Sequence, residues 1–220
     1  MAALMKQTPA HNVVNRDLLA LMPSGARHVV EVGCMQGALA AAYRSANPGT
    51  RYTGIDIDPG YAAAAAAHCD TALAGDIEKF EHEKFDVLFP SDCWVFGDCL
   101  EHLRDPWRLV RRIRERIAPE GCLVACIPNG QHWSVQMRLA TGLFRYEDRG
   151  LLDRTHLRWF TRKSARQLAA NSGYHIVKEQ IVFKPRYARF WGALNGFQIV
   201  LNLAPNTAHE GVRTEQDARA

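Results

Sequence analysis

Short apolar runs alternate with amphipathic segments along most of the chain. The run 28–32, which contains three valines, is apolar enough for a strand buried on both faces. It breaks at a glycine turn, and the alanine-rich segment that follows favours a helix. Because this order recurs, the pattern predicts a mostly parallel sheet with helices on both sides. The strands are expected at 28–32, 51–55, 71–74, 93–96, 122–127, 174–183 and 197–203.

Helices are expected before the first strand and between the others. They are predicted at 12–22, 38–42, 61–68, 107–117, 162–171 and 187–194. Two assignments stay open at this point. Residues 85–89 are an alternative to 93–96 for the fourth strand, and 197–203 also fits an interface strand or helix.

The alternation stops after the fifth strand. Residues 131–161 are rich in aromatic residues, histidine and arginine and carry no strand pattern. We interpret this segment, called the lid, as a cover over the carboxyl ends of the strands, where ligands bind in sheets of this kind. We therefore expect one domain over 1–205 with the lid inserted after strand five, and a disordered tail over 206–220.

Length and composition fit this interpretation. A chain of 220 residues has room for one sizeable core, and 47% hydrophobic with 23% charged residues is ordinary for a globular protein. The net charge of +4 does not require nucleic acid as a partner. The six cysteines form no C-x-x-C pair, which favours reduced thiols. Since no apolar run reaches about 20 residues, a cytoplasmic protein is expected.

Acidic residues stand at the end of four of the predicted strands or just past it. They are Glu31, Asp56, Asp76 and Asp98. Because the carboxyl ends of parallel strands meet at one edge of a sheet, these side chains are expected to lie along it. A carboxylate after the second strand can accept hydrogen bonds from both hydroxyls of a ribose, and one after the third can reach an adenine. The alternative is that these residues only cap the helices that follow.

Four blocks of sequence resemble the motifs of class I S-adenosylmethionine-dependent methyltransferases. The blocks are 31–37 (EVGCMQG), 53–59 (TGIDIDP), 74–77 (AGDI) and 96–106 (FGDCLEHLRDP). The fourth is similar to the ubiquinone-biosynthesis O-methyltransferases. Residues 127–133 and 150–161 look like bacterial methyltransferases of surface-glycan or secondary metabolism. The resemblance spans roughly 12–183 and implies a Rossmann-like α/β fold with a seven-stranded sheet.

The resemblance also implies a binding site for S-adenosylmethionine. Its methionine part would be held by Glu31 and the backbone of 33–37, its ribose by Asp56, and its adenine by residues 76 and 77. The residues implied for the cofactor are Glu31, Gly33, Cys34, Met35, Gly37, Asp56, Ile57, Asp76, Ile77 and Asp98. The family usually has a glycine where Met35 stands, and a positive φ there would cost on the order of 1 kcal/mol.

Histidines are the candidates for catalysis. If the methyl acceptor is a hydroxyl, its proton must be removed, and histidine titrates close enough to neutral pH to accept it. His102 follows the fourth strand and is the first choice, before His156 and His132 of the lid. For each, the alternative is a structural histidine that only orders its loop.

A metal site is implied by the same resemblance. In the ubiquinone-pathway relatives a similar acidic run is associated with a divalent metal, which here implies Asp98, Glu101 and His102 as ligands of Mg²⁺. The competing interpretation is that Glu101 caps the next helix or pairs with a nearby arginine, Arg104 or Arg108.

We therefore expect a methyltransferase that O-methylates a small molecule or a glycan-linked acceptor. N-methylation stays open because an amine needs less help from a base, and a binding module without turnover is the alternative that Met35 favours. A nucleic-acid methyltransferase is less favoured, since residues 98–101 (DCLE) lack the signature of base amino-methylation. Arginines of the lid suit a phosphate or carboxylate on the acceptor. The oligomeric state does not follow from the sequence.

Overall fold

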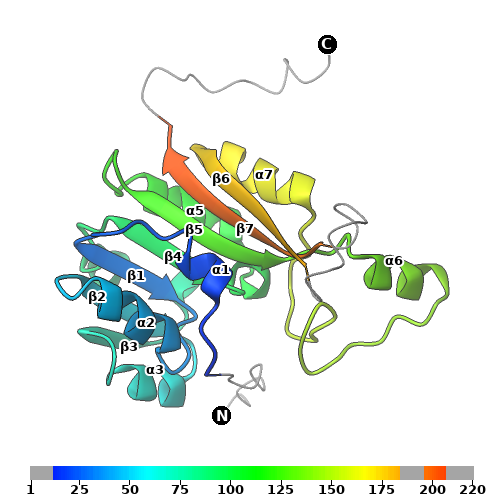
Figure 1. Ribbon diagram of the computed structural model, residues 1–220, viewed down its shortest axis with the longest axis horizontal. Coiled ribbons are helices and arrows are strands. Elements are labelled where there is room, and N and C mark those ends of the chain that lie inside the picture. Colours follow the sequence, from blue (N-terminus) through cyan, green and yellow to red (C-terminus); the bar gives the residue numbers. More distant parts are fainter. Residues whose placement is uncertain (1–11, 184–195, 207–220) are drawn as a thin grey trace.

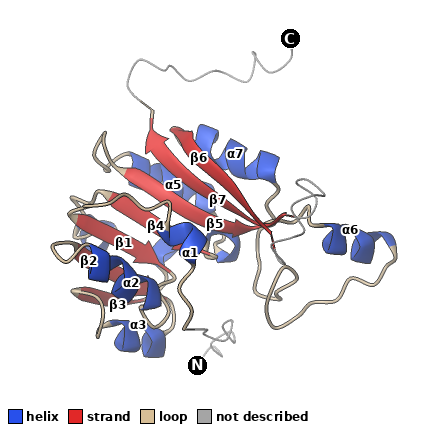
Figure 2. Ribbon diagram, in the orientation of Figure 1, coloured by secondary structure: helices blue, strands red, loops and turns tan. Residues whose placement is uncertain are grey.

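The computed structural model of the chain describes residues 12–183 and 196–206. They form a seven-stranded sheet in the order β3-β2-β1-β4-β5-β7-β6, with helices on both faces (Figures 1 and 2). The strands are β1 (His28–Val32), β2 (Arg51–Asp56), β3 (Thr71–Ala74), β4 (Cys93–Gly97), β5 (Cys122–Pro128), β6 (Tyr174–Phe183) and β7 (Gly196–Pro205). The helices are α1 (Arg16–Leu19), α2 (Ala38–Ala46), α3 (Pro59–Ala65), α4 (His82–Asp86), α5 (Pro106–Arg114), α6 (Trp133–Ala140) and α7 (Arg162–Asn171), with 3-10 turns η1 (Ile77–Lys79) and η2 (Leu100–His102).

Strand direction divides the sheet into two parts. The strands β1 to β5 are parallel to their neighbours, whereas β7 is antiparallel to both β5 and β6. The predicted α/β sheet of seven mostly parallel strands is therefore confirmed. Because β1 to β5 run in one direction, the turns that follow them lie along one edge of the sheet, called the carboxyl edge below.

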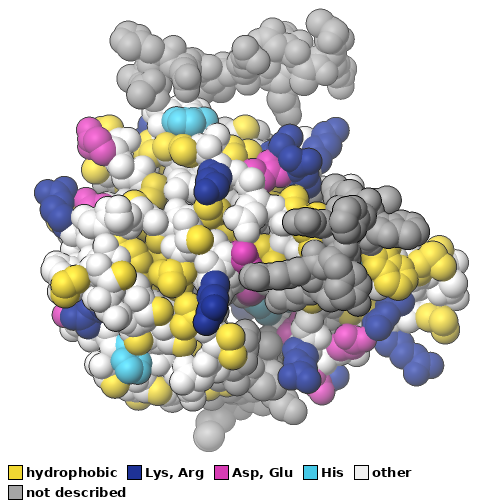
Figure 3. All heavy atoms as spheres, viewed as in Figure 1, with side chains coloured by type: hydrophobic (Ala, Val, Ile, Leu, Met, Phe, Trp, Pro, Cys, Tyr) yellow, Lys and Arg dark blue, Asp and Glu magenta, His cyan; other side chains and the backbone are white. Residues whose placement is uncertain are grey.

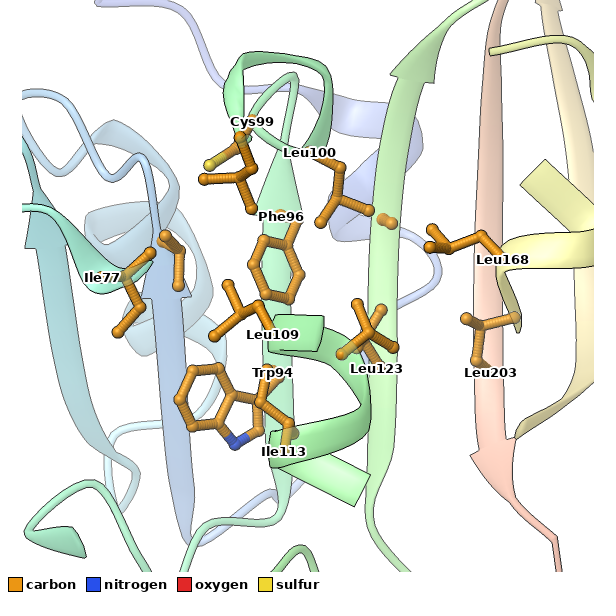
Figure 4. Close-up of a cluster of buried hydrophobic side chains, with 14 of the residues drawn as sticks. Ile77, Trp94, Phe96, Cys99, Leu100, Leu109, Ile113, Leu123, Leu168 and Leu203 are labelled. Carbon is orange, nitrogen blue, oxygen red and sulfur yellow. The ribbon is translucent and has the colours of Figure 1, made fainter. Parts of the chain in front are cut away.

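Both faces of the sheet are buried. In β4, Trp94 and Phe96 belong to one buried cluster, whereas Cys93 and Val95 belong to a second cluster on the other face. The first cluster includes residues of α5 and α7 and is drawn in Figure 4; the second includes residues of α1, α2 and α3. This two-sided burial explains why the central strands are continuous apolar runs and not alternating ones.

The structure decides the assignments that the sequence left open. The fourth strand is β4, and Phe85 instead lies in α4, where its ring packs 5.9 Å from that of Trp94. Residues 197–203 lie within β7 inside the sheet, so the interface alternative is wrong. The helix expected over 12–22 is the shorter α1. Its N-cap is Asn15, whose side chain accepts a hydrogen bond from the Leu18 N–H, so the helix begins only after that residue. The helix expected over 187–194 and residues 207–220 lie outside the described residues.

The lid leaves the sheet at the end of β5 and returns to it. Its helix α6 projects from the body of the molecule (Figure 1). The lid has a small core of its own around Val135, Leu151 and Leu152. Other large apolar side chains of the lid are exposed, among them Trp133 and Leu143, and basic side chains lie beside apolar ones on this projecting part (Figure 3). No helix among the described residues has the length and apolar character needed to cross a membrane.

Candidate functional site

The chain turns sharply after β1, at the carboxyl edge. Gly33 and Gly37 have φ angles of 79° and 80°, a left-handed conformation that favours glycine. The Gly33 N–H donates to the Ile55 carbonyl at 2.8 Å, which ties the turn to β2. A Cβ on Gly37 would lie 3.2 Å from atoms of both Ala65 and His68. Because no side chain caps α2, the backbone N–H groups of its first turn are available to the polar groups of a ligand.

Met35 stands between these glycines and shares their backbone conformation. Its φ angle is 46°, the positive value for which a cost of about 1 kcal/mol is expected. Its N–H donates to Asp56 Oδ2 at 2.8 Å. Such outliers persist only where their surroundings hold them, and they cluster at functional sites. The side chain of Asp56 therefore holds the strained turn in place.

Replacing Met35 by glycine is expected to raise the free energy of unfolding by up to about 1 kcal/mol, because the left-handed strain disappears. Chemical denaturation of the two proteins measures the change. The matched control is Gln36→Gly at the next position, where φ is not positive and glycine only adds entropy to the unfolded chain. Equal destabilisation by both substitutions would show that Met35 carries no strain.

Asp56 is held by backbone groups on both sides. Besides the bond from Met35, its Oδ1 accepts the Asp58 N–H at 2.9 Å. Burial raises the pKa of the Asp56 carboxyl, and these backbone hydrogen bonds oppose the shift. The neighbouring Ile57 is 45% exposed and presents an apolar surface at the carboxyl edge. A carboxylate and an apolar side chain thus stand together after β2.

Glu31 lies beneath the turn and not at the surface. Its carboxylate is buried, and Oε2 accepts a hydrogen bond from the Tyr52 hydroxyl at 2.9 Å. Burial raises the pKa of Glu31 to about 7. The Cys34 side chain is buried as well. These two predicted cofactor residues support the turn from within the core.

Asp76 has a capping role in this structure. Its Oδ1 accepts the Glu78 N–H at 3.1 Å at the start of η1, and its other oxygen lies 3.3 Å from Lys79 Nζ. Ile77 is buried in the core cluster that contains α5. The capping alternative left open by the sequence therefore applies at Asp76.

Asp98 turns toward β7. The Gln198 amide donates to both of its carboxylate oxygens, at 2.6 Å and 2.8 Å. Its φ angle of 49° makes it, with Met35, one of two non-glycine residues of positive φ among the described residues. Both follow strands at the carboxyl edge, which marks this edge as the strained part of the fold.

His132 orders its own loop. It caps α6, with the Ser134 N–H donating to His132 Nδ1 at 3.3 Å. Its ring packs edge-on against Phe197 of β7. The structural alternative therefore accounts for the contacts of this third catalytic candidate.

The other two histidines meet at Glu101, which lies on η2. His102 Nε2 and His156 Nε2 each lie 3.9 Å from Glu101 Oε1, and the two rings meet edge-on with centroids 4.8 Å apart. The ligand atoms of the three residues all lie within 4.8 Å of one another. Asp98 is not among them. We call Glu101, His102 and His156 the Glu–His–His cluster.

A backbone carbonyl fixes which nitrogen of the His102 ring carries the proton. The His102 Nδ1 lies 3.2 Å from the Thr155 carbonyl oxygen. A carbonyl only accepts, so Nδ1 carries the hydrogen and Nε2 of the neutral ring has a lone pair. The His156 ring bonds to the Leu151 carbonyl. Burial lowers the pKa of both rings, that of His156 to about 4. Both are therefore neutral near pH 7.

The lid is fastened beside this cluster. The Glu101 carbonyl accepts the N–H groups of Leu157 and Arg158 at 2.8 Å and 2.9 Å. The hydroxyl of Thr155 bonds to the buried Asp153 carboxylate at 2.6 Å. The loop that carries His156 is thus positioned by η2, and both histidines keep their orientation.

Sequence reasoning missed three partners of the site. They are Tyr52, which bonds to Glu31, Thr155, which orients His102, and Gln198, which holds Asp98. Only Thr155 had a local signal, because it lies in the DRTH run at 153–156. Tyr52 lies on β2 beside β1, but the sequence does not show the side-chain contact with Glu31. Gln198 reaches the site from β7, whose neighbours in the sheet the sequence does not reveal.

Comparison with known proteins agrees with this architecture. Residues 30–123 match the family described as a methyltransferase domain. The structure resembles a putative methyltransferase from Haloferax volcanii in complex with the Trm112 activator (TM-score 0.62, 18% identity, 89% of this chain and 90% of that chain). No curated protein matches the sequence.

Two small-molecule enzymes are also similar. One is an O-methyltransferase of neocarzinostatin biosynthesis bound to S-adenosylmethionine (TM-score 0.57, 15% identity, 87% of this chain and 53% of that chain). The other is the N,N-8-amino-8-demethyl-D-riboflavin dimethyltransferase of Streptomyces davawensis (TM-score 0.55, 19% identity, 82% and 50%). The chain spans about half the length of these two proteins.

The strand order and the similar solved structures together define the fold. The fold is that of the class I S-adenosylmethionine-dependent methyltransferases. The match of residues 30–123 to a methyltransferase-domain family agrees with the resemblance stated from the four sequence blocks.

Proposed function

We propose that the chain transfers the methyl group of S-adenosylmethionine to a hydroxyl of a small-molecule or glycan-linked acceptor. The observation that carries this proposal is the meeting of two features at the carboxyl edge. One is the strained turn from Gly33 to Gly37 held by Asp56. The other is a pair of neutral imidazoles, those of His102 and His156, whose Nε2 atoms converge on Glu101 at the neighbouring turn.

The cofactor would bind across the turns after β1 and β2. The backbone N–H groups at the start of α2 suit the carboxylate of its methionine part. The Asp56 carboxylate would still have lone pairs for the ribose hydroxyls beside the backbone bonds that it accepts from Met35 and Asp58. Ile57 offers apolar surface to the adenine. Glu31 supports this site from beneath.

His102 is the residue we assign to accept the proton of the acceptor. Its side chain is 28% exposed, whereas that of His156 is 6% exposed. As the acceptor oxygen attacks the methyl carbon in line, the carbon–sulfur bond breaks and S-adenosylhomocysteine leaves. The hydroxyl proton passes to His102 Nε2. Burial lowers the pKa of His102, so its ring is neutral before it accepts the proton.

The acceptor is proposed to be a small aromatic or glycan-linked molecule. The lid exposes Trp133, Tyr146 and Trp159, which suit a ring or a sugar. Several lid arginines are engaged, Arg138 with Glu147 and Arg154 with Asp148. The structural relatives include both an O- and an N-methyltransferase, so an amine acceptor is the alternative.

The Mg²⁺ site implied by the resemblance does not fit the geometry. Asp98, Glu101 and His102 were the expected ligands, but the Asp98 side chain is turned toward the Gln198 amide of β7. Asp98 also lies outside the group of converging ligand atoms. No step of the proposed reaction therefore depends on Mg²⁺.

Two measurements on the purified chain test the proposal. Calorimetric titration with S-adenosylmethionine and S-adenosylhomocysteine establishes the cofactor. A panel of phenols, sugars and matched amines with methyl-labelled cofactor then identifies the acceptor atom by mass spectrometry. We expect binding of both cofactors and labelled methyl ethers. If only amines were methylated, the acceptor group would be an amine and not a hydroxyl. If the folded protein bound neither S-adenosylmethionine nor S-adenosylhomocysteine, a binding module without turnover would be favoured.

A further inference from the structure

Aromatic rings form a continuous series from the candidate base to the surface of the lid. The rings of His102 and His156 meet edge-on at 4.8 Å between centroids, and those of His156 and Trp159 meet edge-on at 6.2 Å. Trp159 in turn packs against Phe144 at 5.9 Å, and Phe144 against Tyr146 at 5.3 Å. These separations are those of interacting aromatic pairs. We call Phe144, Tyr146 and Trp159 the aromatic platform.

Trp159 is exposed although the backbone on both sides of it is fixed. The Arg158 N–H donates to the Glu101 carbonyl at 2.9 Å, and the Phe160 carbonyl accepts the Gly130 N–H at 2.7 Å. A Cβ on Gly130 would lie 3.2 Å from Trp159 Cε3, so the indole lies against the turn after β5. The residue is nevertheless 40% exposed. A tryptophan held in this way leaves apolar surface in water that the ring of a ligand can cover.

The aromatic platform begins at the carboxyl edge of the sheet. His102 lies on η2, which follows β4, and Gly130, against which Trp159 packs, lies directly after β5. Ligands of open α/β sheets bind outside the carboxyl ends of the strands. The platform and the strained turn that would hold the cofactor therefore belong to the same edge.

The carboxylates of the lid favour a flat aromatic ring over a sugar as the occupant of the platform. A sugar needs hydrogen-bond partners for its hydroxyls, and carboxylates are the strongest acceptors among side chains. All three carboxylates of the lid are engaged within the lid: Glu147 with Arg138, Asp148 with Arg154, and Asp153 with Thr155. An aromatic ring needs no such partners, because it gains by covering the exposed face of Trp159.

We propose that the aromatic platform binds the acceptor by stacking, so that the acceptor is a planar phenol and not a sugar hydroxyl. The inference rests on the proposed function, whose acceptor it narrows to one chemical class. Trp159 determines this specificity, because its ring is fixed and adjoins the imidazoles. Tyr146, which is 60% exposed, extends the platform outward. The platform contributes orientation of the phenol hydroxyl toward His102.

Calorimetric titration of the full chain with naphthol tests the platform. We expect naphthol to bind, and its saturated analogue decahydronaphthol and methyl glucoside to bind at least about tenfold more weakly. The variant Trp159→Ala is expected to bind naphthol at least about tenfold more weakly than the wild type, with Trp159→Phe between the two. The matched control is Leu139→Ala, which removes another exposed apolar side chain of the lid and keeps wild-type affinity. Circular dichroism verifies that each variant is folded.

Each titration is made with and without S-adenosylhomocysteine, which separates the platform from the proposed methyl transfer. If naphthol binds as expected but the cofactor does not, methyl transfer is overturned and the aromatic site stands. If the cofactor binds and folded Trp159→Ala keeps wild-type affinity for naphthol, the platform is overturned and methyl transfer stands. The platform is also overturned if the folded wild type binds no naphthol, if decahydronaphthol or methyl glucoside binds as tightly, or if Leu139→Ala loses as much affinity.

Discussion

Replacing Asp56 by alanine is expected to weaken binding of S-adenosylmethionine by about 100-fold or more. Each hydrogen bond to a charged group is worth about 1.5–3 kcal/mol, and this carboxylate is assigned two from the ribose. The substitution also removes the acceptor of the Met35 N–H at 2.8 Å, so the strained turn loses its support. Both effects act in the same direction. Calorimetric titration of the variant measures the loss.

Two further variants separate lost contacts from lost folding. Asp56→Asn keeps the shape of the side chain and one acceptor oxygen, so this variant should remain folded. Its affinity for the cofactor is expected to be at least about tenfold lower than that of the wild type. Asp58→Ala is the matched control, since the Asp58 side chain caps α3 through the N–H groups of Gly60 and Tyr61, while the Asp58 N–H that donates to Asp56 is kept. It should cost about 1 kcal/mol of stability and no affinity. Wild-type affinity in folded Asp56→Asn would remove Asp56 from the cofactor site.

The Glu31→Gln variant is expected to abolish a pH dependence of stability worth about 3 kcal/mol. In the folded protein burial raises the pKa of Glu31 to about 7, from an ordinary value of 4.5. The folded state therefore holds a proton that the unfolded state has released between these two pH values. Stability from this group is fully present below pH 4.5 and is lost as pH rises toward 7 and above, at up to about 1.4 kcal/mol per pH unit.

Chemical denaturation of both proteins without cofactor, from pH 4.5 to 8, measures this difference. Glutamine still accepts the hydrogen bond from the Tyr52 hydroxyl but carries no titrating proton. The free energy of unfolding of the variant, relative to that of the wild type, therefore increases as pH rises. Glu83→Gln removes an exposed carboxylate of α4 instead, and should change stability equally at both ends of the range. If the difference in stability between wild type and Glu31→Gln did not change with pH, the pKa of Glu31 would not be raised in the folded protein.

The local pattern of apolar and polar residues was sufficient to predict most of the strands and helices. The strands at 71–74 and 174–183 begin and end where the sequence predicted, because glycines and polar residues bound them closely. The first helix was predicted too long, since Asn15 caps it within the expected span. Residues 85–89 show the opposite limit. Phe85 lies near the end of the short helix α4 and packs against Trp94, and a short apolar run of this kind has the same composition as a buried strand.

The site was predictable where its residues are local in sequence. The glycine turn and Asp56 belong to two adjacent βα units, so their proximity follows from strand order alone. Asp98 was grouped with Glu101 and His102 because they are neighbours in the chain. The partner that draws it away, Gln198, is 100 residues distant. His156 likewise reaches Glu101 through a loop whose course no periodicity indicates.

The place of β7 in the sheet has a consequence for how the chain is made. β6 is synthesised before β7 but pairs only with it, and β7 alone joins β6 to β5. Until β7 emerges, the growing chain carries β5 with an unpaired edge and β6 with no partner, and such edges invite association with other chains. The five parallel strands can assemble early during translation. The hairpin of β6 and β7 must close late, and with it the Gln198 contact that fixes Asp98 at the carboxyl edge.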